Sequence, residues 1–358
     1  MRLPGSAEQR DEWPRVSVIV AACDEASGIE AATRAKLASD YPNLEVVLVE
    51  DRSRDETPAI ADRLAREEPR LRVVHVKELP PGWLGKVHAM HVGQASATGE
   101  WLLFSDADVH FEPDLLRRFM QAVLEADLEF ATTLPEVRPS GFILDVLLST
   151  LLRLLVAGGR FHAVRDPRSR AAVGGGVFNL VKRSALERTK GFEWLRMEIA
   201  DDMALGQMLK DAGAREAVVD GSSGIHLHFY RSVAEMMRGA EKNGYAVFGA
   251  LRPLQLLATV GLVLYLELGA ALALLAPTPA NLALSAVAMG TLGLTQVLVA
   301  RASRRPLGSA LVLGLGALCM VIFALRSAFL THSRGGVVWR GTLYPLAELR
   351  AGRRMRLF

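Results

Sequence analysis

The sequence has few of the residues that mark secreted or zinc-binding proteins. Its 358 residues include two cysteines, Cys23 and Cys319, and neither lies in a metal-ligand spacing. This argues against both a disulfide framework and a zinc site. The first fifteen residues, MRLPGSAEQRDEWPR, contain no apolar core of a signal peptide. We therefore expect the N-terminal part to stay in the cytoplasm, where free cysteines are normal.

The larger part of the chain also lacks a surplus of positive charge. Residues 1–250 contain 31 lysines and arginines against 37 aspartates and glutamates, whereas residues 251–358 contain 11 against 2. A protein that neutralises nucleic-acid phosphates needs a basic surface, so the acidic balance of residues 1–250 argues against a nucleic-acid partner. The sequence pI near 9.0 is a property of the C-terminal part.

Apolar residues, in contrast, are abundant: they make up 50% of the chain, and the mean hydropathy is +0.21. Three segments, 254–276, 280–299 and 307–330, have the length of membrane spans and contain only Glu267 and Arg326 as charges. We predict transmembrane helices there, the first two forming a hairpin across APTPAN. A charge inside a span is costly, so Glu267 is expected to face the bundle or water, with Arg326 as a candidate partner.

The arginines beside these segments give conflicting orientations. The connector RASRRP favours a cytoplasmic position for residues 301–305, in agreement with a cytoplasmic N-terminal part. The basic tail, residues 331–358, also favours the cytoplasm, although a third full span would export it. We favour a re-entrant 307–330 segment, with Gly314 and Gly316 near its middle, and an exported tail is the alternative.

Residues 16–134 alternate short β-branched runs with helical patterns, the runs being VSVIVAA, EVVLVE and LRVVHV. This alternation predicts a parallel sheet covered by helices, in which ligands bind beyond the carboxyl ends of the strands. The first strand is followed by ACDE and not by G-x-G-x-x-G, so a dinucleotide site lacks its main support.

Residues 141–157, GFILDVLLSTLLRLLVA, form a strongly apolar helical stretch that contains Asp145 and Arg153. A comfortable span needs about 20 apolar residues, and this stretch is shorter and charged. We interpret it as a helix at the membrane interface; a plain core helix is the alternative.

The run FSDADV, residues 104–109, is an apolar strand that ends in two carboxylates, Asp106 and Asp108. Carboxylates at positions i and i+2 beyond a strand can hold a hard divalent cation such as Mg²⁺ or Mn²⁺, which can also grip a substrate diphosphate. The alternative is an ordinary polar turn.

Two further acidic clusters follow the same logic. EDRSRDET ends the second strand, and Asp51 in it would lie where a carboxylate can accept a ring N–H from a nucleotide base. Asp55 and Thr57 are expected only to cap the next helix. EIADD, residues 198–202, precedes a helical pattern and offers a general base.

Taken in order, these motifs resemble the inverting glycosyltransferases of family 2, which have the GT-A fold. The resemblance covers most of residues 16–245 and is carried by VSVIVAACDE, VEDRSRDET, PPGWLGKVHAMHVG, FSDADVHFEP, VGGGVFNLVKRSALERTKGF and EIADDMALGQMLKDAG. The spacing of these motifs and the ending GGVVWRGTLY resemble the membrane-anchored branch that acts on lipid acceptors such as hopanoids, carotenoid acids or sphingoid lipids.

The resemblance implies a role for each matching residue. Asp202 matches the catalytic base, Asp106 and Asp108 match the metal and donor ligands, and further donor contacts fall on Glu25, Asp51 and Lys86. Other diphosphate or acceptor contacts fall on Asp201, Arg231, Arg238, Trp339 and Arg340. For Lys86 the alternative is a solvated surface lysine. Gly174–Gly176 would let backbone approach the substrates closely, unless they form only a flexible turn.

The sequence departs from the processive members of that family, which carry Q-x-x-R-W after the base. The corresponding stretch here, FYRSVAEMMRGAEKN, has no tryptophan, which argues against a polymer synthase. Arg231, Arg238 and Lys242 recur at seven and four residues and so share one face of an expected helix. They face either the donor phosphates and lipid headgroup or the anionic membrane surface.

These observations together predict an α/β chain: a GT-A (Rossmann-like nucleotide-diphospho-sugar transferase) domain, residues 1–245, followed by a helical membrane region, residues 251–330, and a basic tail. The resemblance implies metal-dependent transfer of a sugar from a UDP-sugar to a lipid at the cytoplasmic face of the inner membrane. The alternatives are a polyprenyl-phosphate glycosyltransferase and a non-catalytic membrane scaffold or lipid transporter that retains the fold.

Overall fold

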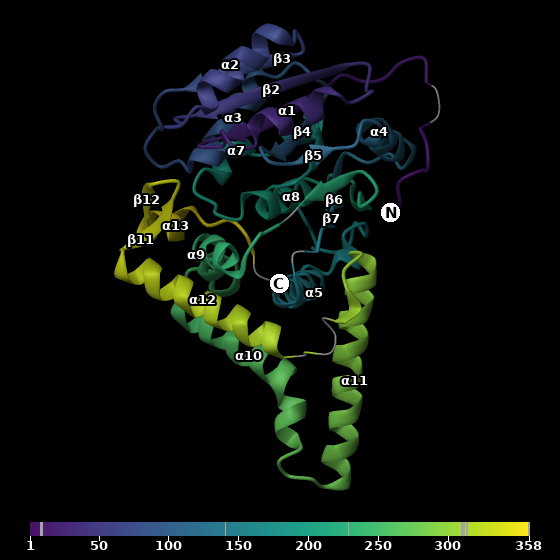
Figure 1. Cartoon of the computed structure of the whole chain (residues 1–358), viewed down its shortest axis with the longest axis vertical. Coiled ribbons are helices and arrows are strands. Elements are labelled where there is room, and N and C mark those ends of the chain that lie inside the picture. The colour runs from purple at the N-terminus through teal and green to yellow at the C-terminus, as the bar shows by residue number, and fades with distance from the viewer. Residues whose placement is uncertain (8–9, 140, 228, 309–311, 313, 357–358) are drawn as a thin grey trace. The chain divides into compact units, whose positions relative to one another are not determined.

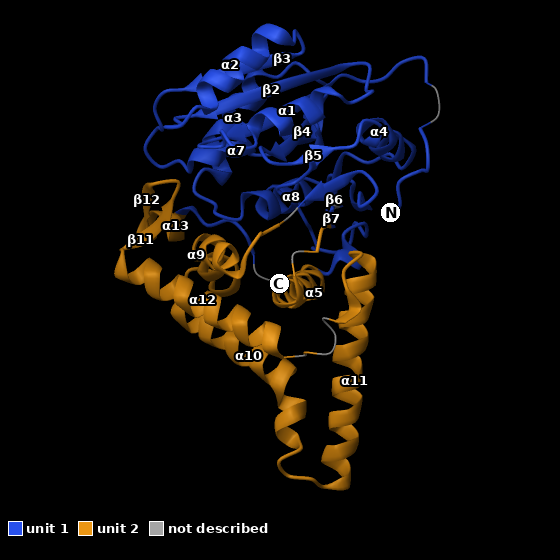
Figure 2. Ribbon diagram, in the orientation of Figure 1, with its two compact units in different colours: residues 1–136, 160–227, 352–356 blue, residues 137–159, 228–351, 357–358 orange. Residues whose placement is uncertain are grey.

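A computed structural model describes residues 1–7, 10–139, 141–227, 229–308, 312 and 314–356 of the chain. The chain divides into two compact units, coloured separately in Figure 2. Unit 1 comprises Met1–Glu136, Arg160–Leu227 and Gly352–Arg356, and unit 2 comprises Val137–Gly159, His228–Ala351 and Leu357–Phe358. The units therefore interleave along the sequence, whereas the sequence patterns predict a boundary near residue 245.

Unit 1 is built on a seven-stranded sheet, several strands of which are labelled in Figure 1. The strand order is β3-β2-β1-β4-β8-β6-β9. Its strands are β1 (Val16–Ala22), β2 (Leu44–Asp51), β3 (Leu71–Val76), β4 (Trp101–Asp106), β6 (Phe130–Leu134), β8 (Asn179–Lys182) and β9 (Glu216–Asp220). All eight residues of β2 are buried, as expected for a strand covered on both faces. A three-stranded sheet has the order β5-β10-β7, with bounds His110–Phe111, Ile225–Leu227 and Glu136–Val137.

The large sheet is mixed, and not wholly parallel as the sequence patterns predict. β3, β2, β1 and β4 are parallel, but β8 runs antiparallel to both of its neighbours. The reason lies where β4 ends: the backbone N–H of Asp106 donates to the carbonyl of Gly176, 3.0 Å away. Strand β8 begins soon after Gly176, beside the carboxyl end of β4. To pair with β4, β8 must therefore run in the opposite direction.

The helices of unit 1 are α1 (Ile29–Leu37), α2 (Thr57–Glu67), α3 (Gly85–Ser96), α4 (Leu115–Glu125), α6 (Arg183–Glu187), α7 (Gly191–Leu195), α8 (Asp201–Asp211) and a 3-10 turn at Phe161–Ala163. The predicted helix start at Pro113 and Asp114 is confirmed, since α4 begins directly after Asp114. The buried cluster of apolar residues on β1, β2 and β4 includes contributions from α1, α2 and α4.

Unit 2 is mainly helical. It contains α5 (Phe142–Gly159), α9 (Val233–Gly249), α10 (Pro253–Ala273), α11 (Pro279–Ala302), α12 (Leu315–Ser333), strands β11 (Gly336–Trp339) and β12 (Thr342–Pro345). It also contains helix α13 (Leu346–Gly352) except for its last residue, which belongs to unit 1. Among the described residues, α5, α10, α11 and α12 are long and apolar enough to cross a membrane. Helices α10 and α11 expose most of their apolar side chains, Leu254 by 82% for example.

The helices expected at 254–276 and 280–299 are confirmed as α10 and α11. The segment expected at 307–330 is not one helix over that range. Residues 309–311 and 313 lie outside the described part, and α12 begins only at Leu315, after Gly314 with φ +86°. Gly314 is therefore at a helix start, where its left-handed backbone suits glycine, and not at the middle of the segment. A helix at 141–157 is also confirmed, as α5, and its place at a membrane interface stays a prediction.

Buried ion pairs hold α5 within unit 2. Arg153 NH2 lies 2.5 Å from Glu267 Oε1 on α10, and Asp145 is bound by the fully buried Arg305. The predicted pairing of Glu267 with Arg326 is wrong, because Arg326 NH1 bonds to Glu241 Oε1 on α9, 2.6 Å away. Two charges eight residues apart on α5 lie on one helix face, so both can point into the bundle.

We expect Arg153→Ala to lower the free energy of unfolding by about 3–5 kcal/mol, because it leaves the carboxylate of Glu267 buried without its cation. The double variant Arg153→Met, Glu267→Leu should recover most of that loss. Thermal unfolding in detergent measures both. As a control, Arg34→Ala breaks only pairs with half-exposed carboxylates, which solvent screens, and should leave the stability nearly unchanged. A double variant as unstable as the single one would contradict this account.

A second prediction concerns Glu216 on β9, which is 2% exposed and whose two carboxylate oxygens have no hydrogen-bond partner among the described residues. Burial raises its pKa well above 4.5, although Lys210 nearby acts in the opposite direction. The folded protein thus keeps a proton that the unfolded chain loses, and Glu216 destabilises the fold increasingly as pH rises above 4.5.

The variant Glu216→Gln cannot ionise. Its melting temperature, relative to that of the unaltered protein, should therefore rise as the pH is raised from 4.5 to 8. The exposed Glu187→Gln serves as the matched control. Parallel pH profiles for Glu216→Gln and the unaltered protein would refute the assignment.

Candidate functional site

The carboxyl ends of β1, β2 and β4 meet at one edge of the sheet in unit 1. Strand β1 lies between the other two, with Ala22 opposite Glu50 and Ala21 opposite Asp106. The last residues of β2 and β4, Asp51 and Asp106, therefore flank the end of β1 on either side. Parallel strands place ligand-binding loops at this edge, so the structure brings the first two predicted carboxylates to the predicted place.

Hydrogen bonds connect the loop that follows β1 to the loop that follows β2. The backbone N–H of Arg54 donates to Asp24 Oδ1 at 2.7 Å, and that of Glu25 donates to Thr57 Oγ1 at 2.9 Å. Asp55 accepts from the backbone N–H of Thr57 and, through its other oxygen, from that of Ala26. The capping expected of Asp55 and Thr57 needs correction, because the cap position of α2 is Glu56 and makes no side-chain cap bond. Asp55 accepts the N–H of Thr57, the first residue of α2, and together Asp55 and Thr57 fix the loop that carries the half-buried Glu25.

Asp51 is 3% exposed, and its carboxylate is held by the neighbouring Arg52, with Nε 2.7 Å from Oδ1 and NH2 3.1 Å from Oδ2. Helix α3 begins against it. A Cβ added to Gly85 would lie 2.5 Å from Asp51 Oδ2, so only glycine allows this approach. Arg52 was not among the residues expected at this site, although its place beside Asp51 in EDRSRDET was the available signal.

Lys86, the next residue of α3, is not a solvated surface lysine. Its Nζ donates to Asp106 Oδ1 at 2.6 Å and lies 4.0 Å from the buried Asp201 Oδ2. Burial alone would lower the pKa of Lys86, but the charges of Asp106, Asp201 and Asp202 outweigh it and raise the pKa well above its usual range. Lys86 therefore remains a cation among three carboxylates.

Asp202 lies in the first turn of α8, with its carboxylate fixed by two backbone donors. The N–H of Gly176 donates to Oδ2 at 2.8 Å, and the N–H of Met203 donates to Oδ1 at 2.8 Å. Helix N-termini favour negative charge, and α8 begins with both Asp201 and Asp202. The carboxylate is thus held in one orientation.

These side chains share one small cavity. Its lining comprises Lys86, Asp106, Asp201 and Asp202 together with Ala21, Met90, Phe104, Ser105, Gly176, Asn179 and Leu205. Four of the predicted site residues are thus gathered around it. Asp108 is exposed in the turn that follows β4, two residues beyond Asp106.

The three glycines before β8 are fitted closely around this cavity. A Cβ added to Gly174 would lie 1.8 Å from the carbonyl oxygen of Asp202, and one at Gly176 would lie 2.8 Å from Asp106 Oδ2 and 3.3 Å from Lys86 Nζ. In this structure Gly174 and Gly176 thus approach the protein's own site residues, and the close approach of this backbone to donor or acceptor stays a prediction.

Lys36 is a site neighbour that sequence analysis missed. Its side chain is almost fully buried, and Nζ donates to the carbonyl of Val109 at 2.5 Å, just beyond Asp108. Burial lowers the pKa of Lys36 to about 8, while the charges of Asp108 and Asp106 act in the opposite direction. The available signal was a lysine on the apolar face of α1, in register with Ile29, Ala32 and Thr33.

The remaining predicted contacts belong to unit 2. The face expected for Arg231, Arg238 and Lys242 needs correction, because Arg231 precedes α9 and its N–H donates to Glu235 Oε2, at 2.8 Å, as part of the helix cap. Lys242 lies over the ring of Trp339, 3.6 Å from its centroid. Arg340 and Gly341, both with positive φ, form the two-residue turn between β11 and β12.

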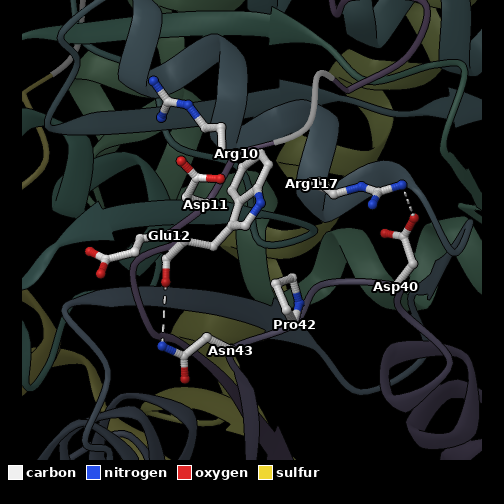
Figure 3. A pocket seen from close by; sticks show the side chains of 8 residues that line it. Arg10, Asp11, Glu12, Asp40, Pro42, Asn43 and Arg117 are labelled. Carbon is white, nitrogen blue, oxygen red and sulfur yellow. Dashed lines mark hydrogen bonds and ion pairs between the residues drawn. The ribbon is translucent and has the colours of Figure 1, made fainter.

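Unit 1 also has a hollow at the opposite edge of the sheet, where β1 and β2 begin (Figure 3). It is lined by Arg10, Asp11, Glu12, Trp13, Asp40, Pro42, Asn43 and Arg117. Arg117 pairs with Asp40 across it at 2.6 Å. None of the predicted site residues lines it, so we assign it no part in the chemistry.

Comparison with known proteins agrees with this geometry. Residues 14–242 match the model of the family described as glycosyltransferase like family 2. The chain belongs to this family. The match covers the strands and loops that carry Asp51, Asp106 and Asp202, and it gives the chain a glycosyltransferase domain.

Curated relatives of this family 2 glycosyltransferase match shorter stretches. Over 122 residues the chain is 34% identical to the succinoglycan biosynthesis protein ExoO of Rhizobium meliloti. This alignment covers 34% of this chain and 33% of that protein. Over 108 residues it is 37% identical to a beta-monoglucosyldiacylglycerol synthase of Synechocystis. This second alignment covers 30% of this chain and 22% of that protein. The chain thus spans a third or less of the length of these relatives.

Among solved structures, a mannosyltransferase from Pyrobaculum calidifontis in complex with GDP-Man and Mn²⁺ is similar over 92% of this chain and 90% of that chain. The TM-score is 0.55 and the sequence identity 23%. This likeness concerns the fold. The predicted GT-A, Rossmann-like α/β domain is confirmed, with the mixed sheet described above.

The three glycines give a matched set of substitutions. Gly176→Ala should displace Asp106 or Lys86, the groups proposed to contact the donor, and so lower the affinity for a nucleoside diphosphate by about tenfold or more. Gly174→Ala meets the backbone of Asp202 and should instead lower the free energy of unfolding by about 1–3 kcal/mol, as overpacking does. Gly175→Ala approaches Thr132 Oγ1 at 3.3 Å and should bind nearly normally. Calorimetric titration with a nucleoside diphosphate and thermal unfolding test these expectations, and equal affinities for Gly175→Ala and Gly176→Ala would contradict the first.

Proposed function

We propose that this protein transfers a sugar from a UDP-sugar to a lipid acceptor, with inversion at the anomeric carbon, at the cytoplasmic face of the inner membrane. The observation that carries the proposal is the arrangement around one cavity of a cation, Lys86, and a carboxylate in fixed orientation, Asp202. Such a pair can stabilise a leaving diphosphate and accept a proton from an incoming hydroxyl.

The donor contacts follow from the strand ends. Asp51 offers carboxylate oxygens for the N–H of a uracil ring, and Glu25 would lie beside the nucleoside. Because Arg52 already occupies Asp51, a bound base must share or replace that contact. The Pyrobaculum structure was solved with GDP-Man, so the nucleotide is a point that experiment must decide.

The residues present fit a divalent cation, although within the described ranges no three His, Cys, Asp or Glu side chains gather as a complete metal site. Mg²⁺ is often held by one or two carboxylates, with substrate phosphates and water completing its shell. Asp108 is exposed, and the absence of a side chain at Gly176 leaves room beside Asp106 Oδ2. Asp106 and Asp108 would thus hold Mg²⁺ or Mn²⁺, which would neutralise charge on the diphosphate.

The chain's own residues account for the rest of the transfer. As the bond between the anomeric carbon and the diphosphate breaks, negative charge grows on the leaving group, and Lys86 offsets it. Asp202 takes the proton of the acceptor hydroxyl as that oxygen bonds to the opposite face of the sugar. This direct displacement inverts the anomeric carbon and needs no covalent glycosyl-enzyme.

A lipid acceptor is supported by the helices of unit 2 and by the relatives. Four helices long enough to cross a membrane would keep the catalytic unit beside a membrane-bound acceptor and raise its effective concentration. One matching relative is named as a glucosyldiacylglycerol synthase. Arg238, Trp339 and Arg340 in unit 2, together with Arg231 and Asp201, remain our proposed contacts for the diphosphate or the acceptor headgroup.

The direct test is release of nucleoside diphosphate by the detergent-solubilised protein with Mn²⁺ or Mg²⁺, a panel of UDP- and GDP-sugars, and total membrane lipid. We expect UDP release that depends on lipid, and a glycolipid of inverted anomeric configuration by NMR. A product with a sugar–phosphate linkage would instead identify a polyprenyl-phosphate acceptor. A protein that binds no nucleoside diphosphate with or without metal would refute the enzyme proposal.

We expect Asp202→Asn to lower kcat by about 10²–10⁴-fold, because the amide cannot accept the proton, while UDP affinity changes little. Asp211→Asn, at the other end of α8, loses only an exposed ion pair and is the matched control. If Asp202→Asn retained full activity, Asp202 would not be the base.

A further inference from the structure

The chain returns to unit 1 after it has passed through unit 2. Residues 137–159 and 228–351 belong to unit 2, but Gly352–Arg356 belongs to unit 1 (Figure 2). Met355 is 1% exposed, and a Cβ at Gly352 would lie 2.3 Å from the Cβ of Met197. This short segment is therefore packed into unit 1 and is not a loose tail.

The main anchor of the segment is Glu198, which is 3% exposed. Its Oε2 accepts the backbone N–H groups of Arg354 at 2.5 Å and Met355 at 2.7 Å, and its Oε1 accepts the N–H of Ala200 at 3.1 Å. A buried carboxylate needs such donors, and two of the three come from the returning segment. Glu198 therefore ties this segment to the residues that lead into α8.

A second anchor lies farther along α8. Gln207 Oε1 accepts the backbone N–H of Arg356 at 2.9 Å, and its Nε2 donates to the carbonyl of the same residue at 3.1 Å. The Arg356 side chain also pairs with Asp211, but both groups are about half exposed, so this pair contributes little. The segment thus contacts α8 through backbone groups on both sides of Asp202.

We propose that Gly352–Arg356 is a positioning element for the catalytic base, and that Glu198 and Gln207 are the positioning residues through which it acts. The inference rests on the proposed function of Asp202. The hydrogen bonds from the N–H groups of Gly176 and Met203 orient the Asp202 carboxylate. The backbone of Asp202 itself lies only four residues after Glu198, so the bonds of Glu198 hold it in place. Fixing that backbone keeps Asp202 at a constant distance from Lys86 and Asp106.

One truncated and one full-length variant test the proposal. A stop codon after Gly352 removes residues 353–358, and Glu198→Gln keeps the whole segment but replaces one acceptor oxygen by an N–H₂ donor that faces backbone N–H groups. Asp211→Asn is the control, because it breaks only the exposed pair with Arg356. UDP binding by calorimetry counts the folded sites in each preparation.

Per UDP-binding site, we expect both variants to lower kcat by about 10- to 100-fold, since a displacement of the base by an ångström has an effect of this order. The KM for the UDP-sugar and the affinity for UDP should stay unchanged, and the control should retain its kcat. Hydrogen exchange at the backbone amides of Asp202, Met203 and Ala204 should become faster in both variants.

Unchanged kcat and unchanged exchange in both variants would overturn the proposal. So would a loss of activity that merely follows the loss of UDP-binding sites, because the segment would then serve stability alone. If the unaltered protein binds UDP but transfers no sugar, the proposed function fails, and the exchange measurement still decides whether the segment fixes the start of α8.

Discussion

The ion pair between Lys86 and Asp106 is the interaction on which the rest of the candidate site depends. It joins the start of α3 to the end of β4 and places one cation beside three carboxylates, those of Asp106, Asp201 and Asp202. Without that cation these carboxylates would repel one another in a half-buried cavity. A single lysine therefore offsets the negative charge that the cavity gathers.

This concentration of charge constrains the surrounding backbone. Gly85 allows α3 to begin against Asp51, and Gly174 and Gly176 bring the loop that precedes β8 against Asp202 and Asp106. The N–H of Gly176 then binds Asp202, so one glycine both makes room for the ion pair and orients the proposed base. The returning segment Gly352–Arg356 is held on either side of Asp202, by Glu198 just before α8 and by Gln207 within α8.

Local patterns predicted the elements well, because the strands of unit 1 are continuous apolar runs and α10 and α11 are long apolar helices. The strand ends also predicted where Asp51 and Asp106 would lie. The partners of charged residues were not predictable in the same way. Arg153 meets Glu267 over 114 positions, and Arg326 meets Glu241 over 85, so no local pattern identifies either pair. Lys36 lies between these two situations. Its place on an apolar helix face predicts that it is buried, but not that its Nζ bonds to the carbonyl of Val109.

The sequence by itself determined the order of strands and helices, the apolar helices and the family motifs, since each of these is written in residues close together along the chain. Only the tertiary structure decided that β8 runs antiparallel, that Lys86 neutralises Asp106, and that residues 352–356 pack beside α8. These features depend on groups separated by tens to hundreds of residues along the chain. Such groups come into contact only when the whole chain has folded. The sequence supplied the charges, and the fold determined which of them meet.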